Sequence, residues 1–184
     1  MKELSLNILD IVENSVKAGA SLTEILISED DENLTIVIKD NGCGMTDEVV
    51  KGVIDPFYTT RKTRSVGLGI PLLKLAAEQT GGYITISSDT AEESPLSHGT
   101  TVKASFNKSH IDFTPLGDVI STVKTLIQGH PDRDFLYIHE LKSGRIELDT
   151  RDMREVLEDV PLNSIEVISW VGENLEEQYR EINT

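Results

Sequence analysis

The chain has 184 residues, of which 38% are hydrophobic, and a formal net charge of −15 at pH 7. This length suits one domain, or one domain with a small appendage. No apolar run reaches the roughly 18 residues of a membrane-spanning helix, and so acidic a surface repels nucleic acid and anionic lipid. We therefore expect neither a membrane nor a nucleic acid as a partner. The N-terminus lacks a signal-peptide pattern and the lone Cys43 suits a reducing compartment, so we predict a cytoplasmic protein.

The first part of the chain alternates between helical and extended patterns. Apolar residues at 3.6-residue spacing predict a helix over residues 3–18, which Gly19 ends. Residues 24–28 and 34–39 have strand character, and Thr46 is a candidate N-cap for a short helix. The remaining elements predicted in this part are a polar, basic loop from residue 55, a helix from Ile70 to Gly81-Gly82, and strands over 83–88 and 101–106.

The character of the sequence changes near Asn107, where "NKSHIDFTP" is typical of a linker. Beyond it the pattern predicts a helix over 116–127, a hairpin of strands 134–140 and 145–148, and helices over about 151–159 and 163–182. We therefore divide the chain into a domain over 1–108 and a small α/β domain of unknown role over 109–184. The second domain is the expected surface for a protein partner that the sequence does not identify.

Four short motifs follow one another in the first domain. Asp10 and Asn14 are four residues apart, so they meet on one face of the first helix. The stretch "DNGCGM" (40–45) directly follows a predicted strand, "VGLGI" (66–70) opens a helix, and "HGTTV" (98–102) opens the last strand of the domain. Each motif alone is common, but their order and gaps together are specific.

These motifs resemble the GHKL ATPase superfamily, which includes gyrase-type topoisomerases, a heat-shock chaperone, sensor histidine kinases and DNA mismatch-repair ATPases. "LDIVENSVKAGAS" is most similar to the mismatch-repair form of the first box, and "DNGCGM" looks like the second box. "DPFYTTRKTRSVGLGIPLLKLAAEQTGG" resembles the lid and third box of histidine kinases and anti-sigma-factor kinases. The resemblance covers about residues 4–106. It implies an α+β fold, a two-layer α/β sandwich with a mixed sheet, helices on one face, and ATP between helices and lid.

Asp40 is the residue we expect to contact the adenine base. It ends a strand, so its carboxylate can accept a hydrogen bond from an exocyclic amine, which the resemblance makes the adenine amino group. Gly42 and Gly44 would let the base lie against bare backbone. The alternative for Asp40 is a residue of an Asx-turn. Thr100, after Gly99, matches the last box of the family, where its hydroxyl helps to hold the adenine side, although a simple loop-to-strand entry is equally compatible with the sequence.

The third motif is the expected phosphate site. Gly67, Leu68 and Gly69 stand where backbone amides converge at the start of a helix, whose dipole favours phosphate; a plain helix-entry turn is the alternative. Side chains of the preceding loop would close over the same phosphates, or cap local structure, or remain solvated. The loop residues expected to bind nucleotide are Thr59, Thr60, Arg61 and Lys62, and Arg64 is a further basic residue.

The first helix would supply the magnesium ligand and the catalytic residue. The resemblance implies that Asn14 holds a Mg²⁺ ion that keeps most of its waters, against the alternative of an exposed helix amide. Asp10 occupies the position where hydrolytic relatives carry a glutamate base, and it is one methylene shorter, so we expect slow hydrolysis. Glu13 is the alternative base, although it points elsewhere on the helix.

The sequence thus predicts a Mg-dependent ATP-binding protein. The phosphoacceptor hairpin of histidine kinases is missing before the first box, and none of the four histidines lies in such a helix. We therefore expect a regulatory protein kinase that acts in trans on a partner protein. The alternatives are a nucleotide-dependent binding switch with little turnover and a slow ATPase.

Overall fold

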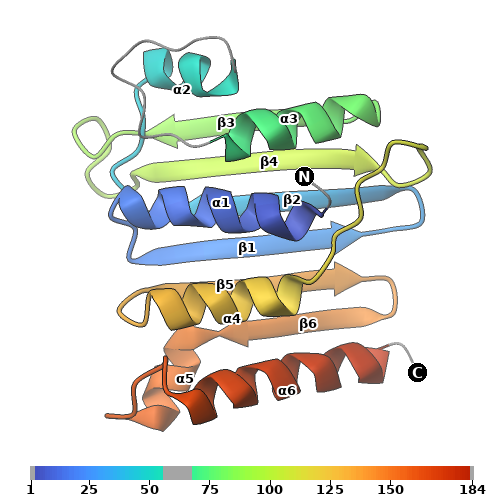
Figure 1. Ribbon diagram of the computed structural model, residues 1–184. Coiled ribbons are helices and arrows are strands. Elements are labelled where there is room, and N and C mark those ends of the chain that lie inside the picture. The colour runs from blue at the N-terminus through green and yellow to red at the C-terminus, as the bar shows by residue number, and fades with distance from the viewer. Residues whose placement is uncertain (1–2, 56–67, 183–184) are drawn as a thin grey trace.

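The computed structural model describes residues 3–55 and 68–182, which form a six-stranded sheet with helices across one face (Figure 1). The strands are β1 (Leu22–Glu29), β2 (Asn33–Asp40), β3 (Tyr83–Asp89), β4 (Gly99–Asn107), β5 (Asp134–Leu141) and β6 (Gly144–Asp149). The helices are α1 (Leu4–Lys17), α2 (Asp47–Ile54), α3 (Gly69–Gln79), α4 (Val119–Gly129), α5 (Thr150–Leu157) and α6 (Ile165–Ile182). The strand order is β3-β4-β2-β1-β5-β6.

The elements form where the apolar pattern predicts them, because each buries its apolar face in the same core. In β2, Leu34, Ile36 and Ile38 alternate with more exposed residues and each is 1% exposed. The α1 face that carries Leu4 and Ile8 is buried against this layer. The predicted cap of α2 is also confirmed, since Thr46 Oγ1 accepts a hydrogen bond from the Val49 N–H.

Helix α4 begins three residues later than the predicted helix over 116–127. Gly117 has a φ of +79°, which ends any helical path before it, and Asp118 is the N-cap, accepting a hydrogen bond from the Ser121 N–H at 2.9 Å. Leu116 instead accepts a backbone hydrogen bond from the Ser5 N–H. The end of the linker is thereby attached to the start of α1.

The C-terminal segment continues the sheet of the first part of the chain. β5 pairs in parallel with β1, from Leu22 opposite Asp134 to Ser28 opposite Glu140, while all other strand pairs are antiparallel. One hydrophobic cluster includes residues of both parts. The mixed α+β sheet is therefore confirmed, and whether residues 1–108 fold without the C-terminal segment stays a prediction.

A buried polar chain links the two parts at one end of the β1–β5 pair. His139, 3% exposed, places Nε2 at 3.1 Å from Glu29 Oε1 and Nδ1 at 2.7 Å from the Tyr179 hydroxyl. Tyr179 also bonds to the Tyr137 hydroxyl at 2.6 Å, and burial raises the pKa values of both tyrosines, that of Tyr179 to about 12. The bond from His139, against the opposing effect of burial, lowers the pKa of Glu29 to about 2, and Lys108 at 2.8 Å adds to this.

None of the helices in the described ranges has the length and hydropathy needed to cross a membrane.

Candidate functional site

The Asp40 carboxylate lies where β2, α1 and β4 meet. Its Oδ2 accepts a hydrogen bond from the Ser15 hydroxyl at 2.7 Å, and its Oδ1 accepts from the backbone N–H groups of Gly42 at 2.9 Å and Thr100 at 3.3 Å. A carboxylate offers about four acceptor positions, so three donors leave room for one more. The bond from Gly42 is the Asx-turn that the sequence offered as the alternative. Asp40 therefore shapes the turn and keeps a capacity to accept a hydrogen bond from a ligand.

The glycines of the second motif are needed for the packing of the chain itself. Gly44 has a φ of +73°, and a Cβ there would lie 1.9 Å from the Asp89 carbonyl oxygen. A Cβ at Gly42 would lie 3.0 Å from the Cβ and the carbonyl oxygen of Ala18. Protein atoms fill the space on the Cβ side of both glycines. Their contact with an adenine base stays a prediction.

Thr100 is tied to the same loop through Ser88. The two hydroxyl oxygens lie 2.8 Å apart, and Ser88 Oγ also accepts a hydrogen bond from the Met45 N–H at 2.8 Å. His98 adds a further bond from its Nδ1 to the Gly42 carbonyl oxygen. The end of β2, the loop after it and the start of β4 are thus held as one unit.

The first and third motifs meet where α3 begins on α1. Gly69 is the first residue of α3, and a Cβ there would lie 2.8 Å from the Cβ of Asp10. The Asp10 side chain is exposed, and Leu68, which directly precedes Gly69, is 68% exposed. The backbone that starts α3 therefore lies close to the proposed catalytic side chain, as the phosphate-site prediction requires.

Asn14 lies one turn beyond Asp10 on α1, half-buried. Its Nδ2 atom is buried and has no hydrogen-bond partner among the described residues. This NH₂ group can only donate a hydrogen bond, so the role that the sequence predicts for Asn14, a ligand of Mg²⁺, would fall to the side-chain oxygen and stays a prediction. Glu13, the alternative base, instead bonds to His130, the C-cap residue of α4. The Glu13 Oε1 and His130 Nε2 atoms lie 2.8 Å apart.

The basic loop lies outside the described residues. This applies to five of the predicted nucleotide contacts, and their roles stay predictions: Thr59, Thr60, Arg61, Lys62 and Gly67.

Sequence reasoning missed three side chains that build the site. Ser15 lies on the apolar face of α1 and is 4% exposed, and its hydroxyl donates a hydrogen bond to Asp40. A small polar residue on an apolar face, directly after Asn14, was the available signal. Ser88 and His98 gave no such signal, since their partners in the loop after β2 are far away in sequence.

Comparison with known proteins identifies the family. Residues 2–110 match the sequence model of the histidine kinase-, DNA gyrase B-, and HSP90-like ATPases, and the chain belongs to this family. Sporulation kinase E of Bacillus subtilis is 32% identical over 89 residues, which are 48% of this chain and 12% of that protein. Sensor histidine kinase YxdK of the same organism is 31% identical over 112 residues, 57% of this chain and 33% of that protein. This chain therefore covers a third or less of these relatives.

The solved structures with a similar fold extend the comparison past residue 110. The Aquifex aeolicus MutL ATPase domain complexed with ADP has a TM-score of 0.54 at 16% identity, covering 86% of this chain and 70% of that one. The N-terminal domain of a DNA repair protein has a TM-score of 0.55 at 14% identity, covering 81% and 52%. Each match covers more than residues 2–110 of this chain, so part of the C-terminal segment shares the fold. The GHKL assignment and the α+β fold are confirmed.

Proposed function

We propose that this chain binds Mg-ATP between α1, the loop after β2 and the start of α3, and acts as a regulatory protein kinase on a partner protein. The observation that carries the nucleotide assignment is the Asp40 carboxylate, held by Ser15, Gly42 and Thr100 with one acceptor position left. Family membership supports ATP as the ligand. The adenine amino group would donate to Asp40.

The phosphates would extend from the base toward Gly69, along the α1 side that carries Asn14 and Asp10. Asn14 would bind the Mg²⁺ ion through its side-chain amide oxygen, since the amide nitrogen can only donate hydrogen bonds, and the ion would neutralise charge on the phosphate oxygens. Asp10, exposed beside the first residue of α3, would accept a proton from the attacking group. Gly67 and the basic residues of the loop would complete the phosphate contacts.

The kinase assignment is supported by relatives named as kinases. In the proposed step, the bond between the γ-phosphorus and its bridging oxygen breaks, ADP leaves with that oxygen, and a partner side chain bonds to phosphorus and loses its proton to Asp10. The net charge of −15 favours a protein over a nucleic acid as partner, and a free thiol at Cys43 suits the cytoplasm. A nucleotide-dependent binding switch is the second candidate, because Asp10 is short for a base.

Incubation with γ-labelled ATP, with and without cell extract, tests the choice between these functions. A kinase labels a partner protein, an ATPase releases free phosphate, and a switch does neither but captures a partner that differs between ATP and ADP. We expect a labelled protein in the extract and little free phosphate without it. Rapid release of phosphate by the protein alone would contradict both the kinase and the switch.

The base contact itself is tested by Asp40→Asn. The substitution replaces an acceptor-only group with an amide that can present a donor to the adenine amine, so ATP affinity should fall by roughly tenfold to a hundredfold. Calorimetry with ATP and with ITP, whose base carries an oxygen in place of the amino group, makes the test specific. We expect the wild type to prefer ATP and the variant to lose that preference. An equal loss for both nucleotides would mean that Asp40 acts only through the turn.

A further inference from the structure

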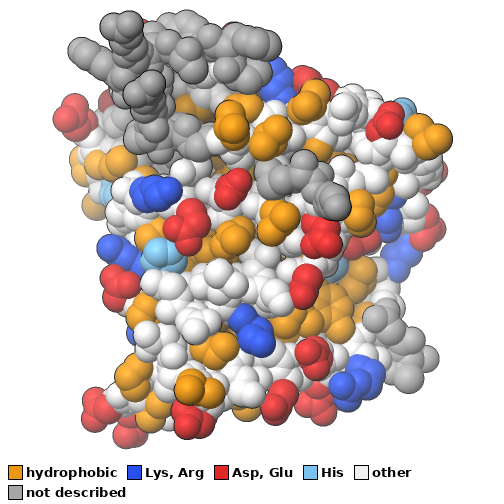
Figure 2. All heavy atoms as spheres, viewed as in Figure 1, with side chains coloured by type: hydrophobic (Ala, Val, Ile, Leu, Met, Phe, Trp, Pro, Cys, Tyr) orange, Lys and Arg blue, Asp and Glu red, His pale blue; other side chains and the backbone are white. Residues whose placement is uncertain are grey.

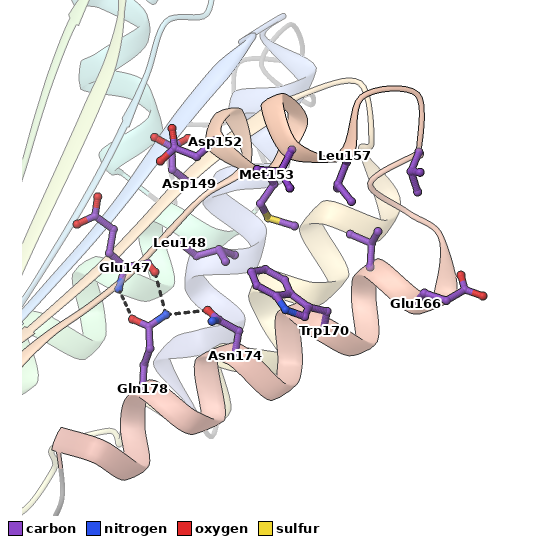
Figure 3. A pocket seen from close by; sticks show the side chains of 13 residues that line it. Glu147, Leu148, Asp149, Asp152, Met153, Leu157, Glu166, Trp170, Asn174 and Gln178 are labelled. Carbon is purple, nitrogen blue, oxygen red and sulfur yellow. Dashed lines mark hydrogen bonds between the residues drawn. The ribbon is translucent and has the colours of Figure 1, made fainter.

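A groove runs along the C-terminal part of the molecule, far from the proposed nucleotide site. It has a volume of about 770 Å³ and lies between β6, α5 and α6 (Figure 3). Its apolar lining includes Leu148, Met153, Leu157, Val167 and Trp170. Trp170 points across the groove toward α5.

This apolar surface is open to solvent. Val156 is 83% exposed, Val160 is 49% exposed and Trp170 is 49% exposed, and all three line the groove. Water-exposed valine and tryptophan side chains gathered on one concave surface are typical of a binding site. The sphere view shows hydrophobic side chains among carboxylates over the lower part of the molecule, where α5 and α6 lie (Figure 2).

The rim of the groove is acidic. Four carboxylates line it, Glu147, Asp149, Asp152 and Glu166, and the lining includes no lysine or arginine. Two of the four are paired from outside the groove: Arg145 lies 2.8 Å from Glu147, and Arg151 lies 2.6 Å from Asp149. Asp152 and Glu166, one on each helix, form no ion pair within 4.0 Å among the described residues, so the surface complements a ligand that is both apolar and basic.

The edge of the sheet beside the groove is blocked against strand addition. β6 is the last strand of the sheet, and the Gln178 side chain bonds to both backbone groups of Glu147, with its Oε1 2.9 Å from N and its Nε2 3.0 Å from O. Asn174 fixes that amide through a further bond at 2.8 Å. An extended peptide cannot pair with β6 at this point. A helix that lies between α5 and α6 needs no backbone hydrogen bonds from the groove.

We propose that this groove binds a basic amphipathic helix of the partner protein, with its apolar face on Trp170 and Val156 and its lysines or arginines against Asp152 and Glu166. The inference rests on the proposed function, because it identifies the partner-binding surface of the C-terminal segment. Under this proposal the partner binds beside β6, at one edge of the sheet, and the nucleotide binds near the interior strands β2 and β4.

Trp170 is the only tryptophan of the chain, so its fluorescence reports on the groove directly. The probe is a synthetic peptide of about 15 residues, long enough to form a helix on binding, with leucines on one face and lysines on the other. Titration of the whole protein should shift Trp170 emission, with a Kd on the order of 10 μM that weakens with added salt. A matched leucine–glutamate peptide should cause no shift.

Matched double variants separate the rim from the general acidity of the surface. Asp152→Lys with Glu166→Lys reverses one rim charge on each helix, and should weaken binding by about tenfold or more. Glu155→Lys with Glu176→Lys makes the same charge change on α5 and α6 at exposed residues outside the lining, and should have little effect. Equal losses in both pairs, or binding of the glutamate peptide, would overturn the proposal.

Val156→Asp tests the apolar half of the interaction at a side chain that is already 83% exposed, where folding is not at risk. It should abolish the fluorescence shift while ATP binding, measured by calorimetry, stays unchanged. Loss of a dimer in Val156→Asp, seen by light scattering, would instead mean that a second copy of this chain occupies the groove. Failure of ATP binding in the wild type would contradict the proposed function and not this surface.

Discussion

Single residues far apart in sequence converge on Asp40. Ser15 lies on α1 and Thr100 on β4, and both donate to the carboxylate that ends β2. A buried hydroxyl such as that of Ser15 needs a hydrogen-bond partner, and here the partner is the side chain proposed to recognise the base. Helix α1 and the sheet thus fix the Asp40 carboxylate before any ligand binds.

The Asn14 amide gives a test of the proposed magnesium site. Asn14→Ala should weaken binding of Mg-ATP by about tenfold and leave metal-free ATP binding nearly unchanged, as calorimetry with and without Mg²⁺ can show. The matched control is Asn7→Ala, two turns earlier on α1, whose Nδ2 is also buried without a partner among the described residues. Similar losses in both variants, or a loss that ignores Mg²⁺, would mean that Asn14 only packs the helix.

Asp10 gives a test of the catalytic assignment. General-base alignment contributes about 10²–10⁴-fold and responds to displacements of about an ångström, so the short side chain should keep hydrolysis slow. Asp10→Glu should raise the rate of phosphate release, and Asp10→Ala should remove what remains. A wild-type rate above about one per second, as typical enzymes reach, would show that reach is not limiting.

At the scale of elements, the contact between α1 and α3 sets the geometry of the proposed phosphate site. It depends on Gly69, because a Cβ there would come within 2.8 Å of the Asp10 Cβ, closer than two carbon atoms can approach. The start of α3 can lie against α1 at this distance only with glycine. Helix α2, whose N-cap is Thr46, lies above β3 in the view of Figure 1.

Gly69→Ala should therefore push α3 away from α1. We expect a stability loss of about 1–3 kcal/mol from overpacking and an ATP affinity lowered by about tenfold, measured by denaturant unfolding and calorimetry. Gly129→Ala, at the end of α4 with nothing within 4 Å of the added Cβ, is the control and should be nearly neutral. Full ATP affinity in Gly69→Ala would separate the start of α3 from the nucleotide site.

At the scale of the whole molecule, the parallel pairing of β1 and β5 joins the family domain to the C-terminal segment. The polar chain from Lys108 through Glu29 and His139 to Tyr179 crosses the same seam. Hydrogen bonds through His139 therefore connect Tyr179 of α6, a helix that lines the groove, to Glu29 at the end of β1. The connection is polar, so its strength depends on pH.

Glu29 determines that pH dependence. Its pKa is lowered from 4.5 to about 2 in the folded chain, so the stability it adds is complete above about pH 4.5 and is lost as the pH falls toward 2. The contribution is on the order of 3 kcal/mol at most. Glu29→Gln should lower the free energy of unfolding at pH 7, and the difference from wild type should vanish near pH 2. Glu92→Gln, at an exposed loop residue, should show no such difference at either pH.

The sequence by itself determined the local structure and the family. Helices and strands followed from apolar spacing, because each element buries one face whatever its partner is. The ordered motifs identified the nucleotide-binding family, since Asp10, Asn14, Asp40 and the glycines stand at local positions that a sequence displays directly.

Only the tertiary structure decided how distant segments meet. The sequence predicts a small C-terminal α/β domain but not where it docks, and the structure pairs the first strand of that segment with β1, across more than a hundred residues. Such pairing depends on complementary faces and register, which no local propensity encodes. The same holds for Ser15 on Asp40, for the engagement of Glu13 by His130, and for the groove, whose walls come from β6, α5 and α6. Each of these is a contact between elements, and its energy appears only when the core brings those elements together.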